Sequence, residues 1–133
     1  MGLAADGFSP ALVARSVVAI GVDPALRRRL RAMAGGRSLA IGMYATRCCG
    51  SPYLIGDLTA RFVRLTLPDA VALASIEGVP LVADRRLIDL LASAGPTLVE
   101  VGLPFARHLA VELAEPVAWL DFLASPAACR HRA

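Results

Sequence analysis

The chain of 133 residues has few aromatic residues, no lysine and only three cysteines, and each shortage argues against a class of protein. Aromatic residues make up 5% of the sequence, and all 14 basic residues are arginine. Nucleic-acid-binding surfaces usually combine a broad basic face with stacking aromatics, so we do not expect one here. Three cysteines, an odd number, do not suit a disulfide framework in a chain long enough to build its own core, so we expect reduced thiols.

Long apolar runs are also missing. No run approaches the length of a membrane span, and the N-terminal residues have neither the basic start nor the apolar stretch of a signal peptide. The sequence therefore predicts a cytoplasmic protein that does not bind membranes.

The composition favours one folded domain. Hydrophobic residues make up 56% of the sequence, enough for a single core at this length. We expect a domain over residues 16–124, a flexible N-terminal tail over 1–15 and a flexible C-terminal tail over 125–133.

Local patterns predict an α+β fold, with a mixed sheet or flattened barrel and two main helices. Asp23-Pro24 and Gly35 predict a helix over 24–34, and Asp84 and Gly95 bound a second one. A short helix over 116–123 is expected to cap the core with Trp119, Leu120 and Leu123. Strands are expected at 16–22, 39–46, 58–67, 71–75, 79–83, 97–101 and 107–113.

The basic cluster Arg27-Arg28-Arg29 with Arg31 falls on the first predicted helix. Apolar residues are interleaved with these arginines, a pattern typical of a solvated helix face.

Two of the three cysteines, Cys48 and Cys49, are adjacent, and they follow an apolar segment and precede a Gly-Ser-Pro turn. Thiolates bind soft metals and iron–sulfur clusters, and Arg47 beside them would favour the charged form of the sulfur. Adjacent side chains on extended backbone point to opposite faces, so both sulfurs reach one ion only if the chain turns there. The alternatives are buried, unreactive thiols, or a strained and easily reduced disulfide.

The residues Cys48, Gly50 and Tyr53 resemble the Cys-Ser-Gly-x-x-Tyr pattern of the HesB/IscA-like iron–sulfur biogenesis family, which also follows a strand. Gly78 to Asp84 resembles that family's Gly-Val-x-Val-x-Val-Asp segment, which precedes a helix. A strand and an N-capped helix are also expected before the cysteines, as in the family, so the likeness runs from about Val17 to Pro116. Cys49 in place of serine is similar to small relatives with a Cys-Cys or Cys-selenocysteine pair. The chain departs from the family near its C-terminus, where Cys129 stands alone and the family has a Cys-x-Cys pair.

The resemblance implies a carrier of iron, an iron–sulfur cluster or another thiophilic metal, with iron–sulfur assembly or recipient proteins as partners. Cys48 and Cys49 would bind the metal, and Arg47, Gly50 and Tyr53 would support the loop. A homodimer would supply four sulfurs, and Cys129 or His131 are further candidate ligands. The alternatives are a dithiol/disulfide redox protein and an interaction domain without chemistry.

The sequence favours a binding protein over an enzyme. It shows no carboxylate pair for acid–base catalysis and no nucleophile or phosphate-loop motif. His108 shares a predicted strand face with Glu112, and we interpret it as a partly exposed sheet residue rather than a ligand.

Overall fold

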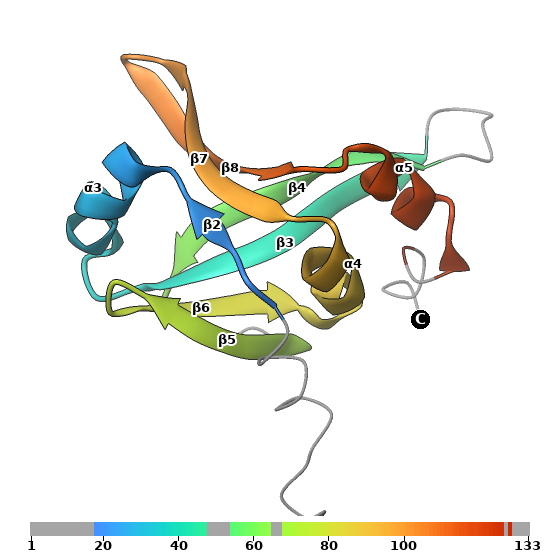
Figure 1. Ribbon diagram of the computed structural model, residues 1–133, viewed down its shortest axis with the longest axis horizontal. Coiled ribbons are helices and arrows are strands. Elements are labelled where there is room, and N and C mark those ends of the chain that lie inside the picture. Colours follow the sequence, from blue (N-terminus) through green and yellow to red (C-terminus); the bar gives the residue numbers. More distant parts are fainter. Residues whose placement is uncertain (1–17, 48–53, 65–67, 127, 129–133) are drawn as a thin grey trace, which may run out of the picture.

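The computed structural model describes residues 18–47, 54–64, 68–126 and 128 (Figure 1). These residues form helices α3 (Pro24–Ala34), α4 (Ile88–Ser93) and α5 (Val117–Leu123), and the 3-10 turn η1 (Arg85–Leu87) leads into α4. Strands β2 to β8 form two mixed sheets. The predicted α+β class is therefore confirmed.

The larger sheet has four strands in the order β4-β3-β6-β5. β3 (Ser38–Arg47) pairs antiparallel with β4 (Leu54–Val63) along its whole length and parallel with β6 (Val79–Asp84) near its start. β5 (Ala70–Ile76) pairs antiparallel with β6, and its register shifts between Leu73 and Ile76. The parallel β3–β6 pair lies at the centre of the sheet, so β4 and β5 are its edges.

The smaller sheet has three strands in the order β2-β7-β8. β2 (Gly21–Val22) pairs parallel with β7 (Pro96–Leu103), and β7 forms an antiparallel hairpin with β8 (Ala106–Leu113). The hairpin turns at Pro104 and Phe105, so β7 continues two residues beyond its predicted end at residue 101.

The sheets do not close into a barrel in the described part of the chain, so the flattened-barrel alternative is wrong there. Closure would require backbone hydrogen bonds between β4 and β8, the facing edges of the two sheets. The two strands run close together (Figure 1), but each pairs with one neighbour only.

Helix α3 begins and ends where the sequence predicts. The Asp23 carboxylate accepts a hydrogen bond from the Leu26 backbone N–H at 3.3 Å, Pro24 occupies the first turn, and Gly35 ends the helix with φ of 56°. Asp84 is also a cap, because its Oδ1 accepts from the Arg86 N–H at 2.9 Å. Local signals were sufficient for both helix starts.

One core joins the sheets to helices α3 and α4. Its fully buried side chains come from α3, from η1 and α4, and from both sheets: Leu26, Leu30, Leu39, Ile41, Leu87, Leu91 and Leu98. Helix α5 adds Phe122 and Leu123, whereas Leu120 is 62% exposed. The prediction that Leu120 caps the core is therefore wrong, because α5 turns that residue to its outer side.

Two predicted strands differ from the observed ones. β4 spans Leu54–Val63 and so begins four residues before the predicted start at 58, because its pairing with β3 extends to the Arg47–Leu54 pair. The predicted end, residues 65–67, lies outside the described part of the chain. At the start of the domain only Gly21 and Val22 are in a strand, and Val18 to Ile20 precede it as irregular chain. Residues 16 and 17 lie outside the described part.

Candidate functional site

The predicted site lies at one end of the β3–β4 hairpin. Arg47 is the last residue of β3 and pairs with Leu54, the first residue of β4. Cys48, Cys49, Gly50 and Tyr53 belong to the segment that joins these two residues, and they lie outside the described part of the chain, as do Cys129 and His131. The structure does define the ends of β3 and β4 on either side of this segment, and these two strand ends are called the frame of the site.

The frame is held by a close approach of the two strands. A Cβ atom added to Gly56 would lie 2.7 Å from the Ala45 Cα and closer still to the Tyr44 carbonyl oxygen. Both neighbours are backbone atoms, which have little freedom to move. Position 56 therefore accommodates only glycine at this approach of the strands.

Helix α5 fixes the same end of the hairpin. The indole Nε1 of Trp119 donates a hydrogen bond to the Gly56 carbonyl oxygen at 2.9 Å. The Trp119 ring also stacks on Phe122, with 5.5 Å between ring centroids, and Phe122 is buried in the core. This chain of contacts ties the start of β4 to the core through α5 (Figure 1).

Two large apolar side chains are exposed on this end of the hairpin. Tyr44 is 62% exposed and Ile55 is 53% exposed. Because Tyr44 pairs with Asp57 and Thr46 pairs with Ile55, Tyr44 and Ile55 are diagonal neighbours on one face of the sheet. Neither residue was predicted to be part of the site, although Tyr44 is out of phase with the core residues Ile41 and Met43.

His108 and Glu112 lie on one face of β8 and both are exposed, in agreement with the interpretation of His108 as a sheet residue. The buried or half-buried residues Leu109, Val111 and Leu113 alternate with them as predicted. Among the described residues, no group of three or more His, Cys, Asp or Glu side chains is placed to hold a metal.

The arginines of α3 are exposed, as predicted, but two of them form ion pairs that the sequence did not reveal. Arg27 contacts Glu77 at 2.8 Å, and Arg29 contacts Glu100 on β7, which Arg107 also approaches at 3.7 Å. The hydrogen bond from Arg29 lowers the pKa of Glu100 below its ordinary value, although desolvation of the carboxylate opposes this. These pairs link α3 to both sheets.

None of the helices in the described residues is long and apolar enough to cross a membrane. In the comparisons with known proteins, no family model matches the chain and no curated protein matches it.

Proposed function

We propose that this chain is a HesB/IscA-like protein that binds iron, an iron–sulfur cluster or another thiophilic metal through Cys48 and Cys49. The observation that carries the proposal is the pairing of Arg47 with Leu54. It makes residues 48–53 the connection of a long antiparallel hairpin, which agrees with the strand-then-cysteine order of the family's pattern. Loops at strand ends are common positions for ligand-binding residues.

Two further elements support the resemblance. A capped helix, α3, precedes the strand that leads to the cysteines, in the order expected of the family. The segment from Gly78 to Asp84 contains β6 and runs directly into η1 and α4, as the Gly-Val-x-Val-x-Val-Asp likeness requires.

Two sulfurs do not complete a site. Iron–sulfur clusters generally take four cysteine ligands, and tetrahedral sites take four ligands. We propose that a symmetric homodimer brings two Cys48–Cys49 pairs together, since a two-fold axis doubles any ligand set that lies beside it. Iron–sulfur assembly or recipient proteins are the partners that such a carrier would serve.

A second candidate function is thiol redox chemistry at the same residues. It is favoured by the lone Cys129, because the chain lacks the C-terminal Cys-x-Cys pair with which the carriers complete their metal site. In this function the two thiols reduce a disulfide of a partner protein to two thiols and form the Cys48–Cys49 disulfide, so that two electrons and two protons pass to the partner. The ring would be strained, and strained disulfides are readily reduced.

Cysteine substitutions separate these functions. The protein is incubated anaerobically with ferrous iron and sulfide, freed of unbound ions, and assayed for metal and for mass by sedimentation. We expect Cys48→Ser and Cys49→Ser each to lose bound iron with an unchanged circular dichroism spectrum, and Cys129→Ser to retain it if the dimer supplies four sulfurs.

Redox chemistry replaces metal binding if the wild type never holds metal but shows a reversible two-electron thiol change that both substitutions abolish. If neither substitution alters metal content or thiol oxidation, both functions are wrong.

A further inference from the structure

The β7–β8 hairpin ends in an apolar tip, Leu103 to Phe105, that projects from the body of the protein (Figure 1). Phe105 is 85% exposed and Leu103 is 59% exposed. Phe105 therefore adds very little packing to its own fold, although a phenylalanine side chain can bury roughly 150–250 Å². Large apolar residues gathered at one exposed point indicate a contact with another molecule.

The backbone holds this tip in one conformation. Leu103 pairs with Ala106, so Pro104 and Phe105 form a two-residue turn, and the proline ring fixes one of its dihedrals. Gly102 before the turn has φ of 109°, and a Cβ atom there would lie 2.5 Å from the Ala106 carbonyl oxygen. So constrained a turn loses little backbone entropy when its side chains are bound.

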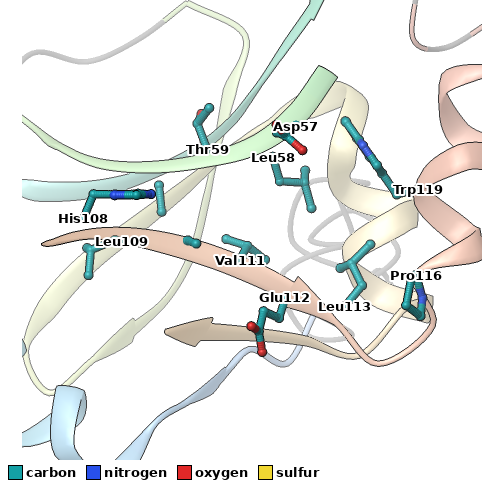
Figure 2. A pocket seen from close by; sticks show the side chains of 12 residues that line it. Asp57, Leu58, Thr59, His108, Leu109, Val111, Glu112, Leu113, Pro116 and Trp119 are labelled. Atoms are coloured by element: carbon teal, nitrogen blue, oxygen red, sulfur yellow. The ribbon is translucent and has the colours of Figure 1, made fainter. Parts of the chain in front are cut away.

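A cavity of about 720 Å³ lies farther along β8, between this strand and β4 (Figure 2). Leu58 of β4, Val111 and Leu113 of β8, and Trp119 of α5 form its apolar part, and all four are half-buried. β4 and β8 lie too close together for a further strand between them, which would need about 4.8 Å on either side. A single side chain needs no such backbone spacing, so the cavity can accommodate one.

The tip and the cavity differ in charge. Arg107 follows the tip by two residues, and its side chain is 51% exposed beyond its contact with Glu100. The cavity lining contains the exposed residues Asp57 and Glu112 and no arginine. The tip is thus apolar with a positive charge beside it, and the cavity is apolar with negative charges beside it.

The tip cannot reach the cavity of its own chain. Phe105 and Val111 are six residues apart on extended chain, a distance of about 20 Å. The β7–β8 pairing is unbroken from Pro96–Leu113 to Leu103–Ala106, so the hairpin does not fold back on itself. The tip that fits the cavity must therefore come from another molecule.

We propose that the protein forms a symmetric dimer in which the tip of each copy enters the cavity of the other. Phe105 packs on Val111, Leu113 and Trp119 of the second copy. Arg107 reaches the carboxylates beside that cavity. A two-fold axis produces both contacts at once, because each copy supplies one tip and one cavity. Two tips and two cavity walls bury roughly 1,000 Å², the lower limit for a specific interface, so we expect a dissociation constant in the micromolar range.

A second copy fits the tip better than a lipid surface does. Binding to an anionic membrane relies on a cluster of basic residues beside the apolar ones. Residues 96–106 of the hairpin include no basic residue and one glutamate. The matching cavity, in contrast, is present in every copy of the chain.

Sedimentation equilibrium of the wild type from about 1 to about 300 μM covers the expected range of affinity. We expect monomer and dimer without larger species. Trp119 is the only tryptophan and lines the cavity, so its fluorescence reports whether the cavity is occupied. Its emission should shift to shorter wavelength with the same midpoint as dimer formation.

Phe105→Ala should raise the dissociation constant at least about 100-fold, because one substitution removes two buried rings from the dimer. Arg107→Gln should raise it about tenfold, the effect of losing two exposed ion pairs. Leu120→Ala is the matched control, since Leu120 is 62% exposed and belongs to neither the tip nor the cavity. Circular dichroism verifies that each variant is folded.

A photoreactive residue identifies the surface that the tip contacts. p-Benzoylphenylalanine placed at position 105 keeps an aromatic ring there and forms a covalent bond with its neighbour on irradiation. We expect a covalent dimer in which peptide mass mapping places the bond within residues 57–60 or 108–119 of the second copy.

The proposal is overturned if the wild type stays monomeric or forms open-ended polymers over this range, if Phe105→Ala or Arg107→Gln associates as tightly as the wild type, or if the covalent bond lies outside the cavity. The contact includes no cysteine, so Cys48→Ser should dimerise as the wild type does. A dimer lost in Cys48→Ser but kept in Phe105→Ala would contradict this contact and support the sulfur-bridged dimer, so the two proposals fail separately.

Discussion

Trp119 and Gly56 are separated by 63 residues in the sequence but joined by a hydrogen bond of 2.9 Å from the indole Nε1 to the carbonyl oxygen. The bond ties α5 to the strand that leaves the predicted cysteine site. Helix α5 has seven residues, too few for stability on its own, so its place depends on such contacts.

Trp119→Phe should remove this bond but keep an aromatic ring against Phe122. We expect a loss of about 1 kcal/mol in the free energy of unfolding, the usual net contribution of one hydrogen bond. Urea denaturation followed by circular dichroism measures it, since the variant has no tryptophan. Leu120→Ala, an exposed position on the same helix, should change the free energy by less than about 0.5 kcal/mol. Equal effects of the two substitutions would show that the bond has no role in stability.

Gly56→Ala should destabilise the β3–β4 hairpin. The added methyl group would meet backbone atoms of Tyr44 and Ala45, so the strands must move apart, at a cost of about 1–3 kcal/mol. Gly42→Ala in the same hairpin is the control, because its Cβ would meet only the Thr59 side-chain oxygen, at 3.3 Å. Urea denaturation should give a clearly lower midpoint for the first variant only. A neutral Gly56→Ala is incompatible with the close approach described above.

The ion pair of Arg29 with Glu100 should contribute to acid sensitivity. Arg29 lowers the pKa of Glu100 in the folded protein below the ordinary value of 4.5, so the unfolded chain binds more protons in this range. The stabilisation is present above pH 4.5 and is lost as the pH falls through the lower folded value.

Glu100→Gln should therefore flatten the dependence of unfolding free energy on pH below about 4.5. Urea denaturation at a series of pH values measures this slope. Glu115→Gln, which removes an exposed carboxylate without an ion pair in the described structure, should leave it unchanged. An unchanged slope in Glu100→Gln would rule out the pair as a source of acid sensitivity.

The elements that the sequence predicted well are those with local signals. Helix α3 lies between Asp23-Pro24 and Gly35, and each of these residues acts through neighbours within a few positions. β8 was predicted from simple alternation, because one face of the strand packs on the core. In both cases the physical cause is contained in a short stretch of chain.

Features that depend on distant partners were missed. The start of β4 contains Gly56 and Asp57, residues that disfavour strands, and becomes a strand because β3 pairs with it. The contact between Arg29 and Glu100 joins positions 71 residues apart, and no pattern in the sequence connects them. Two open sheets in place of a barrel likewise depend on which strands pair, which alternation alone does not determine.

The candidate site was predicted only as a set of residue types. Cys48 and Cys49 were identified by their chemistry and by a resemblance, and their position after a strand agrees with β3 ending at Arg47. The exposed pair Tyr44 and Ile55 and the anchor from Trp119 were not predicted, because each depends on how strands and helix meet. The chemistry of the cysteines stays a prediction.

Metal binding through Cys48 and Cys49 is tested by anaerobic purification, followed at once by a visible absorption spectrum and elemental analysis for iron, zinc and sulfide. We predict thiophilic metal bound in the wild type, and iron with sulfide if the cargo is a cluster, with the metal lost in Cys48→Ser. A colourless protein that holds no metal as purified, and none after reconstitution with iron and sulfide, would contradict it.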